Sequence, residues 1–461
     1  MTSLIPLFSS SSPDKVIAWR DGIAVTAAQF LNDIHSLISI LPNSRHILND
    51  CHDRYHFLVA LCAIMATGKI NLLPSTRTAE TIRQLQTFAP DASCLTDQAN
   101  CAIDLPRTAY PAAAPPPNTD DIPFAIPQIE EMQLVAYVFT SGSTGLPIAH
   151  RKTWGALVRN VQMEALQLGL KSGVNYSIVG TVPAQHMYGF ESTVLMPLVN
   201  GFSLTSAQSF YPADICNSLA QVPEPRVLVT TPVHLRSLLG TQLSLPKIEL
   251  MVSATAPLSP QLALEAEHIF HAPLCEIYGS TETGQIATRR PSESPEWTLF
   301  PNLLMAHSQQ SDASDQRMWI SGGHVEVAMP MNDAIELTGN GRFLLHGRIS
   351  DLINIAGKRS SLSYLNHHLN AIPGVEDGAF YMPPEALSGE VMRLKAFVVA
   401  PTLEISEIIA ILRQKIDPAF MPRPIYKVAR LPRNATGKLP HAALAEFIKT
   451  LATTTDASEH M

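Results

Sequence analysis

Residues 134–145 read LVAYVFTSGSTG, and this stretch decides the expected fold class. The first seven residues are rich in β-branched and aromatic side chains, which predicts a buried strand. The glycines and hydroxyl side chains that follow can form a loop whose backbone N–H groups surround a phosphate chain. The loop is not a Walker A motif, because Gly-Lys-Ser/Thr does not follow it. A buried strand that ends in such a loop favours an α/β fold with a phosphate site over an ordinary Ser/Gly turn.

Strands and helices alternate after this loop, which predicts parallel sheets covered by helices on both faces. The predicted strands are residues 176–182, 227–230, 248–252 and 274–278, and the predicted helices are residues 154–168, 211–221, 232–239 and 260–270. Upstream, residues 57–73 are typical of a buried helix and a short strand, and the proline-rich residues 111–127 of an extended connector.

A different pattern begins further along the chain. Residues 318–347 predict short strands. Beyond residue 350 we expect a separate α+β domain. Its predicted helices are residues 362–370 and 404–415, and its predicted strands are residues 378–382 and 394–399.

Composition excludes several classes of protein. With 461 residues, of which 46% are hydrophobic and 16% charged, the chain is neither disordered nor fibrous. A net charge of −8 argues against nucleic-acid binding. The six cysteines contain no C-x-x-C pair, which makes a zinc ribbon or a redox dithiol unlikely to form. No apolar run reaches the length of a membrane span and no signal segment is recognisable, so we expect a cytoplasmic protein without a membrane partner.

Three further motifs carry candidate chemistry. YGSTETG at residues 278–284 follows a predicted strand and offers Glu282, whose carboxylate suits a hard cation such as Mg²⁺. Asp333 precedes a Gly-Arg pair at Gly347 and Arg348, and together a carboxylate and a guanidinium can hold the hydroxyls of a ribose. NATGK at residues 434–438 places Lys438 on a glycine-containing loop. Alone, each motif is also compatible with an ordinary turn or a surface charge.

In this order the four motifs resemble the adenylate-forming superfamily, which comprises acyl- and aryl-CoA synthetases, nonribosomal adenylation domains and luciferases. The segments 66–74, 253–258 and 319–323 resemble further motifs of that family. The resemblance implies a large N-terminal α/β/α/β/α domain with a distorted β-barrel at residues 1–349. It also implies a small mobile C-terminal α+β domain at residues 350–451 and a tail at residues 452–461.

The resemblance implies that a carboxylic acid and ATP form acyl-AMP, and that a thiol then takes the acyl group. ATP and Mg²⁺ would be required. Several residues would hold the nucleotide: Thr140, Ser141, Gly142, Ser143, Thr144 and Gly145 around the phosphates, Tyr278 on adenine, and Asp333 and Arg348 on ribose. Thr281 would touch the α-phosphate, Glu282 would hold Mg²⁺, and Lys438 would reach both anions as they meet.

The same resemblance places the other substrates. The acid pocket would include His186, Tyr188, Gly189 and Ala254, although His186 and Tyr188 are also compatible with simple core packing. The C-terminal domain would rotate about a hinge at Ser350 after adenylation. This rotation would bring Gly357 and Lys358 to a thiol channel.

The chain departs from the family pattern in several places. Ile148 stands where the family has a lysine after the phosphate loop, and Lys152 or else Arg151 is our candidate to replace that cation. The hinge residue is Ser350 where the family has Asp or Lys, and the loop after Gly357 lacks the family's glutamate. Strings such as HRKTW resemble AMP-ligases found beside aryl-polyene genes, which load an aryl acid onto a carrier protein.

The thiol acceptor is expected to be the phosphopantetheine arm of an acyl carrier protein, with CoA as the alternative. Seven basic residues and one acid, Asp417, lie between residues 413 and 438. The basic residues are Arg413, Lys415, Arg423, Lys427, Arg430, Arg433 and Lys438. Such a patch would steer an acidic carrier, although it is also typical of a solvated face.

Two other functions stay open at this point. Ile148 is compatible with a degenerate protein that binds nucleotide or acyl-adenylate without turnover, although the intact Lys438, Glu282 and Asp333 argue against it. Nothing in the chain favours a luciferase-like oxygenase.

Overall fold

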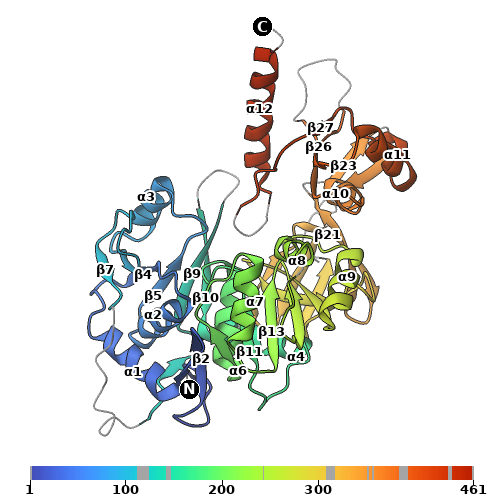
Figure 1. The fold of residues 1–461 in the computed structure, drawn as a ribbon. Coiled ribbons are helices and arrows are strands. Elements are labelled where there is room, and N and C mark those ends of the chain that lie inside the picture. The colour runs from blue at the N-terminus through green and yellow to red at the C-terminus, as the bar shows by residue number, and fades with distance from the viewer. Residues whose placement is uncertain are drawn as a thin grey trace.

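The protein is described by a computed structural model that covers residues 3–111, 124–141, 147–241, 243–307, 317–349, 352–355, 358–383, 393–434 and 439–458. It has the mixed α/β fold that the sequence predicts, with two sheets in its N-terminal part (Figure 1). The small sheet β1 (Leu4–Pro6) and β8 (Gln128–Glu130) lies apart from these two. Within the described residues, no helix is both long and apolar enough to cross a membrane.

The first sheet has six strands in the order β10-β9-β5-β4-β6-β7. The strands are β4 (His46–Asn49), β5 (Ile70–Leu73), β6 (Ser93–Thr96), β7 (Arg107–Ala109), β9 (Leu134–Ser141) and β10 (Pro147–Thr153). The strands from β9 to β7 are parallel, whereas β10 turns back antiparallel against β9. Of the loop predicted at residues 140–145, Thr140 and Ser141 belong to the end of β9.

The second sheet has eleven strands in the order β21-β22-β17-β16-β15-β14-β13-β11-β12-β2-β3. Its parallel centre consists of β2 (Val16–Arg20), β12 (Ser203–Thr205), β11 (Ser177–Gly180), β13 (Arg226–Thr230), β14 (Leu250–Ser253) and β15 (Leu274–Ser280). Antiparallel strands extend both ends: β3 (Ile23–Thr26), β16 (Gly284–Arg289), β17 (Trp297–Leu299), β22 (Arg342–Arg348) and β21 (Asp333–Gly339).

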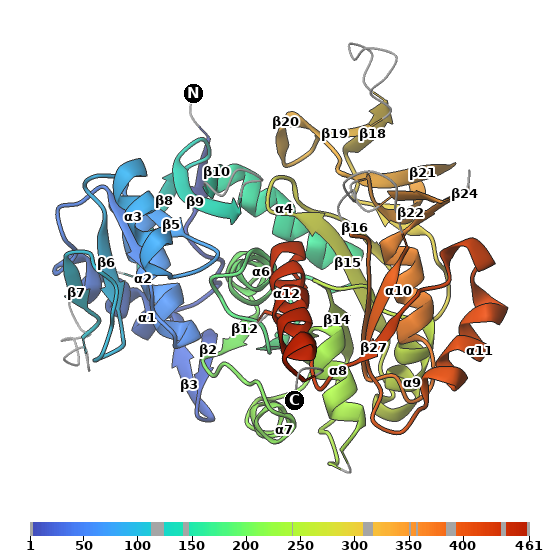
Figure 2. The ribbon, with the colours of Figure 1, turned by 90° about the horizontal axis from the view of Figure 1, so that it is seen from above.

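Helices and sheets form five layers. One outer layer is α3 (Ala79–Phe88), and the opposite outer layer is α7 (Pro212–Ala220), α8 (Pro232–Leu239) and α9 (Pro260–Phe270). Between the sheets lie α1 (Ala27–Ile38), α2 (Arg54–Ala66), α4 (Trp154–Gln167), α5 (Met187–Gly189), the π-helix η1 (Phe190–Leu195) and α6 (Met196–Asn200). Figure 2 shows this order from β6 and α2 across α6 to β14 and α8.

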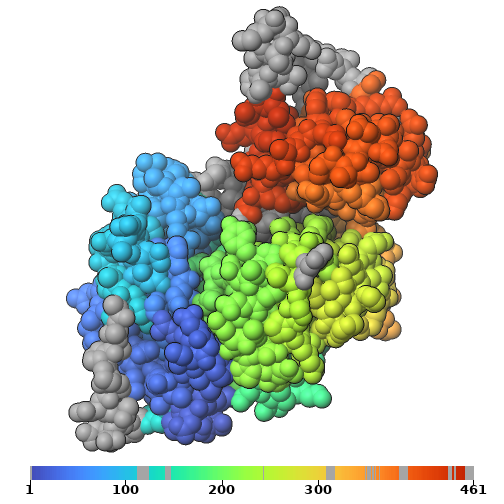
Figure 3. All heavy atoms as spheres, viewed as in Figure 1, coloured from blue at the N-terminus to red at the C-terminus, as the bar shows by residue number. Residues whose placement is uncertain are grey.

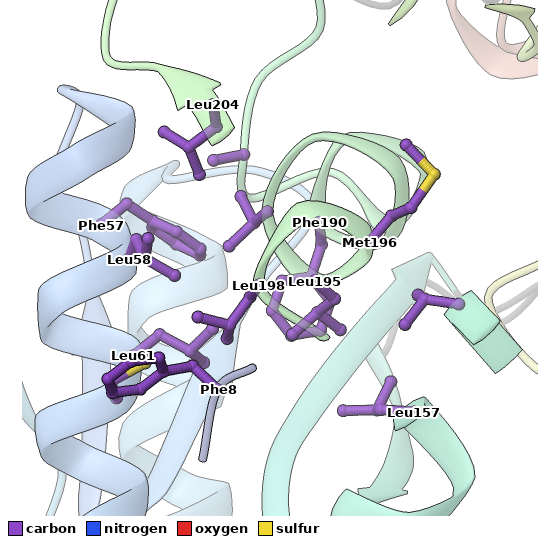
Figure 4. Close-up of a cluster of buried hydrophobic side chains, with 14 of the residues drawn as sticks. Phe8, Phe57, Leu58, Leu61, Leu157, Phe190, Leu195, Met196, Leu198 and Leu204 are labelled. Atoms are coloured by element: carbon purple, nitrogen blue, oxygen red, sulfur yellow. The ribbon is translucent and has the colours of Figure 1, made fainter. Parts of the chain in front are cut away.

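The largest core lies between the two sheets. Phe57 on α2 and Phe190 on η1 are fully buried and meet edge to face, with ring centroids 6.3 Å apart. Figure 4 shows leucines of α2 and α6 packed around this pair. Because the aromatic contact holds η1 from one side, the polar side chains on its opposite face have a fixed direction.

Short antiparallel strands surround a core of their own. They include β18 (Leu303–His307), β19 (Met318–Gly322) and β20 (Val325–Pro330), which form a three-stranded sheet. Together with β16, β17 and β22 they enclose Ile286, Trp297, Phe300 and Phe343. Residues 318–347, for which the sequence predicts short strands, contribute β19, β20, β21 and most of β22 to this region.

The C-terminal part has separate cores. Its main core contains residues from Ile353 to Ile425, and a second contains residues from Ala379 to Leu444. The elements are β23 (Leu352–Ile355), β24 (Lys358–Ser361), α10 (Leu362–Asn370), β25 (Asp377–Tyr381), β26 (Lys395–Val399), α11 (Ile405–Lys415), the 3₁₀ helix η3 (Pro418–Phe420), β27 (Ile425–Lys427) and α12 (His441–Ser458). Figure 3 shows this part, orange to red, as a lobe above the rest. A domain boundary near residue 350 stays our proposal.

Candidate active site

The phosphate-loop motif begins at the end of β9. Thr140 is the Cα partner of Ile148 across the hairpin, and Ile148 is 53% exposed. Thr140 Oγ1 lies 2.9 Å from His150 Nε2 on β10. Gly142, Ser143, Thr144 and Gly145 lie outside the described residues, as does the side chain of Ser141.

The YGSTETG motif forms the end of β15, a tight turn and the start of β16. Ser280 and Thr283 bond to each other through both their hydroxyls and the Thr283 backbone N–H, which closes the turn. Thr281 and Glu282 are half-buried at its tip. Glu282 Oε1 lies 3.8 Å from His150 Nε2. The two phosphate motifs, far apart in the sequence, therefore meet at one imidazole.

The predicted adenosine residues lie beside this turn. The Tyr278 hydroxyl donates to Asp333 Oδ2 at 2.5 Å, and the Tyr278 ring packs near Trp297 and Phe343. Asp333 on β21 is the direct Cα partner of Arg348 on β22. The strand register thus pairs the two residues, Asp333 and Arg348, that the sequence assigns to ribose. The side chain of Arg348 lies outside the described part of the structure.

Lys152 is placed differently from our expectation of a cation that faces the triphosphate. Its side chain is only 7% exposed, and Nζ donates to the backbone carbonyl of Thr281 at 2.5 Å and, more weakly, to that of Glu282 at 3.4 Å. Burial lowers the pKa of this ammonium, an effect that Glu191, Glu282 and Glu326 oppose. Lys152 is bound to the turn because β10 directs it inward. Arg151, its neighbour on the strand, is exposed.

A buried polar cluster lies behind the turn. It contains Glu164 and Asn160 from α4, Glu191 and Ser192 from η1, and Gln285 from β16. The Asn160 amide donates to the Gln285 carbonyl at 3.0 Å, and the Gln285 amide donates to Ser192 Oγ at 2.8 Å. Burial raises the pKa of both Glu164 and Glu191 to about 8.

Gly284 is where this cluster approaches the turn most closely. Its φ is +72°, and a Cβ at this position would lie 2.6 Å from Asn160 Nδ2 and 2.9 Å from Glu191 Oε1. Only glycine satisfies both the left-handed backbone and the lack of space. The last glycine of YGSTETG is therefore explained by packing against the cluster.

Two of the predicted acid-pocket residues, Tyr188 and Ala254, lie at β14. The Tyr188 hydroxyl donates to the Val252 carbonyl at 3.0 Å, and Ala254 follows β14 and is nearly buried. His186 is half-buried and precedes α5. A Cβ at Gly189 would lie 2.0 Å from the Pro183 carbonyl oxygen, so a close backbone approach requires this glycine. Tyr188 and Gly189 thus have a clear packing role, and contact with an acid stays a prediction.

Of the predicted C-terminal residues, the structure places Lys358. Its ammonium forms an exposed ion pair with Asp417 Oδ2 at 2.6 Å. Ser350, Gly357 and Lys438 lie outside the described residues.

Our sequence reasoning missed His150, Glu164 and Glu191. A signal for His150 was available, because Ile148, His150 and Lys152 alternate along residues 147–153 as one face of a strand does. We expected a loop there that leads directly into the helix at residue 154. No signal in the sequence distinguishes Glu164 and Glu191 from solvated carboxylates.

Comparison with known proteins decides the family. Residues 41–303, more than half of the chain, match the family model described as "AMP-binding enzyme". The chain belongs to this family of AMP-binding enzymes. Its predicted membership of the adenylate-forming superfamily is thereby confirmed.

Among curated proteins, this chain is 32% identical over 260 residues to a 4-coumarate–CoA ligase of Rhodobacter capsulatus. The match covers 56% of this chain and 62% of that ligase. It is 25% identical over 363 residues to an L-allo-isoleucine:holo-[CmaA peptidyl-carrier protein] ligase of Pseudomonas savastanoi pv. glycinea, with coverages of 69% and 59%.

The fold is also that of a solved adenylating enzyme. The o-succinylbenzoate CoA synthetase of Bacillus subtilis, determined with its acyl-adenylate intermediate, superposes with a TM-score of 0.79 at 18% identity. The superposition covers 95% of this chain and 97% of the other. The large N-terminal α/β domain expected from the sequence is thereby confirmed.

Proposed function

We propose that this AMP-binding enzyme activates a carboxylic acid with ATP to give acyl-AMP and then transfers the acyl group to a thiol. One observation carries the proposal: Thr140 of the phosphate-loop motif and Glu282 of the YGSTETG turn both approach Nε2 of His150, at 2.9 Å and 3.8 Å. Tyr278, on the strand β15 that ends in this turn, donates a hydrogen bond to Asp333. The residues proposed to contact the phosphates, the cation and the ribose thus lie near one another.

In the first step a carboxylate oxygen of the acid attacks the α-phosphorus. An O–P bond forms, and the bond from the α-phosphorus to the bridging oxygen breaks, so that pyrophosphate leaves with its electron pair. Thr281 would hydrogen-bond the α-phosphate, and Lys438 would neutralise the meeting anions. In the second step a thiolate attacks the acyl carbon, and AMP leaves.

Glu282 fits a magnesium ion. Its carboxylate is 32% exposed at the tip of the turn and offers the hard oxygen ligand that Mg²⁺ prefers. Mg²⁺ bound there would neutralise phosphate charge. The polypeptide's own contribution is to hold this carboxylate beside the loop that begins at Thr140.

The acid is proposed to be aromatic. Tyr188 and Ala254, two residues of the proposed acid pocket, lie at β14, next to the strand that leads to the YGSTETG turn. Similarity to a 4-coumarate–CoA ligase and to an o-succinylbenzoate CoA synthetase supports an aryl acid. The sequences HRKTW at residues 150–154 and GKRSSL at residues 357–362 support membership of the aryl-polyene branch.

For the acceptor we propose a carrier protein, with CoA as the second candidate. In the structure, some side chains of the basic patch that motivates this choice already have partners. Arg433 forms an ion pair with Asp377, Lys427 donates to the Leu403 carbonyl, and Lys358 pairs with Asp417. Arg413, Lys415, Arg423 and Arg430 stay exposed and would steer an acidic carrier.

Pyrophosphate exchange tests the first step. We expect acid-dependent exchange of labelled pyrophosphate into ATP with at least one member of a panel of aryl acids. Binding of ATP without exchange for any acid would favour the degenerate binding protein. Thioester formation with holo-carrier and with CoA at equal concentration then tests the acceptor. A CoA kcat/KM equal to or above that of every carrier tried would overturn the carrier proposal alone.

A further inference from the structure

The strand β10 presents two basic side chains to the catalytic turn. Ile148, His150 and Lys152 share one face of this strand because residues two apart point the same way. The Lys152 ammonium donates to the backbone carbonyls of Thr281 and Glu282. Nε2 of His150 lies 2.9 Å from Thr140 Oγ1 and 3.8 Å from Glu282 Oε1. Two successive residues of the turn are therefore contacted from this one strand.

The Lys152 contact is costly to form, which makes it informative. Lysine is rarely this buried, since transfer of an ammonium out of water is expensive unless it is paired and hydrogen-bonded. Here the ammonium donates to two carbonyls and interacts electrostatically with the carboxyl groups of Glu191, Glu282 and Glu326.

Residues of α4 and η1 also contact the turn and the strand that follows it. Glu191 on η1 approaches Gly284, and Asn160 on α4 holds the next residue, Gln285, through its carbonyl. The η1 helix begins directly after Gly189, so the same segment forms one wall of the proposed acid pocket. The turn thus has contacts from β10, α4 and η1.

We propose that His150 and Lys152 are positioning residues that together hold the Thr281–Glu282 turn against β10 in the geometry required for adenylation. We call this pair the β10 clamp. Its catalytic consequence rests on the proposed function, whereas its effect on the turn does not. His150 and Lys152 lie two and four residues beyond Ile148 on the same strand.

The test uses the full chain and four variants. Lys152→Met keeps the length and volume of the side chain but removes the donor, and Lys152→Arg keeps a cation. His150→Phe keeps a ring of similar size without hydrogen bonds. Lys171→Met, which removes an exposed lysine beyond α4, is the matched control.

Hydrogen exchange of the unliganded protein measures the clamp directly. We expect faster amide exchange in a peptide covering residues 278–286 for Lys152→Met and His150→Phe, and no change for Lys171→Met. Equal exchange in all variants would overturn the proposal. This measurement holds even if the wild type turns over no acid, an outcome that would refute the proposed function instead. If Lys152→Met does not fold, His150→Phe, whose site is only half-buried, decides the question.

Kinetics then separates positioning from loss of stability. We expect Lys152→Met to lower kcat for pyrophosphate exchange by about 100-fold, on the order of a lost transition-state contact, while KM for the acid stays within about twofold. The Mg²⁺ concentration at half-maximal rate should rise, and Lys152→Arg should recover part of kcat. A kcat for Lys152→Met within twofold of that of Lys171→Met would overturn the proposal.

Discussion

The YGSTETG turn and the C-terminal lobe use charge in opposite ways. Around the turn, ionisable groups are buried. Lys152 is 7% exposed and donates to two backbone carbonyls, and Glu191 is 2% exposed. In the C-terminal lobe, Lys358 and Asp417 pair at the surface, at 56% and 37% exposure. Buried groups fix geometry because a lost partner leaves an unsatisfied charge, whereas exposed pairs contribute little. The comparison indicates a rigid site and a lobe whose charges remain available to a partner.

The largest effect is expected from the core that supports the turn. Phe190→Ala should lower the free energy of unfolding of the N-terminal part by about 3–5 kcal/mol, because it leaves a cavity where η1 meets α2. Urea denaturation measures this loss. Leu412→Ala in the separate C-terminal core should instead destabilise that lobe. A single transition that both variants shift equally would contradict two independent cores.

Lys438 of the C-terminal part is expected to act in the first step of the reaction and not in the second. Lys438→Ala should lower the rate of acyl-AMP formation by a factor worth about 3 kcal/mol, because a cation between two meeting anions is lost. Thioester formation from supplied acyl-AMP should continue. Pyrophosphate exchange and a thioester assay measure the two steps. Normal exchange in the variant would remove Lys438 from the proposed mechanism.

The buried carboxylates predict a pH dependence of stability. Burial raises the pKa of Glu164 to about 8, so the folded protein keeps this proton while the unfolded chain loses it above about pH 4.5. Rising pH therefore favours unfolding between these two values, by about 1.4 kcal/mol per pH unit for this one group, and the loss is complete above the folded pKa.

Glu164→Gln should remove that contribution. Urea titrations at pH 5 and pH 8 should show the variant gaining stability relative to wild type as pH rises. An unfolding free energy that falls equally with pH in both proteins would mean that Glu164 is ionised in the folded state.

The smallest effect is expected at the surface of the C-terminal lobe. Asp417→Asn breaks the pair with Lys358, yet both side chains are exposed, so the melting temperature should not change measurably. Differential scanning calorimetry in low and high salt measures it. A clear loss of stability that salt does not remove would show that this lobe, like the turn, depends on fixed charges.

Local signals in the sequence predicted many of the regular elements that border the site. The helices α8, α9 and α10 have the bounds that the pattern predicts, because Pro232 and Pro260 mark the first helical positions and Ser361 caps the third helix. The buried strands β9, β13 and β15 are as expected within two residues. The strand β10 was missed, because PIAHRKT contains charges that are typical of a solvated loop.

The sequence by itself determined the order of motifs, the alternation of strands and helices, and hence the family. Only the tertiary structure decided what His150, Lys152 and Glu191 do. Pairing of β10 with β9 aims His150 and Lys152 at a turn about 130 residues later in the chain, and the π-helix directs Glu191 at the same turn. The environment of a charged side chain depends on elements distant in sequence, and the residue type alone does not reveal whether water or a buried partner will satisfy it.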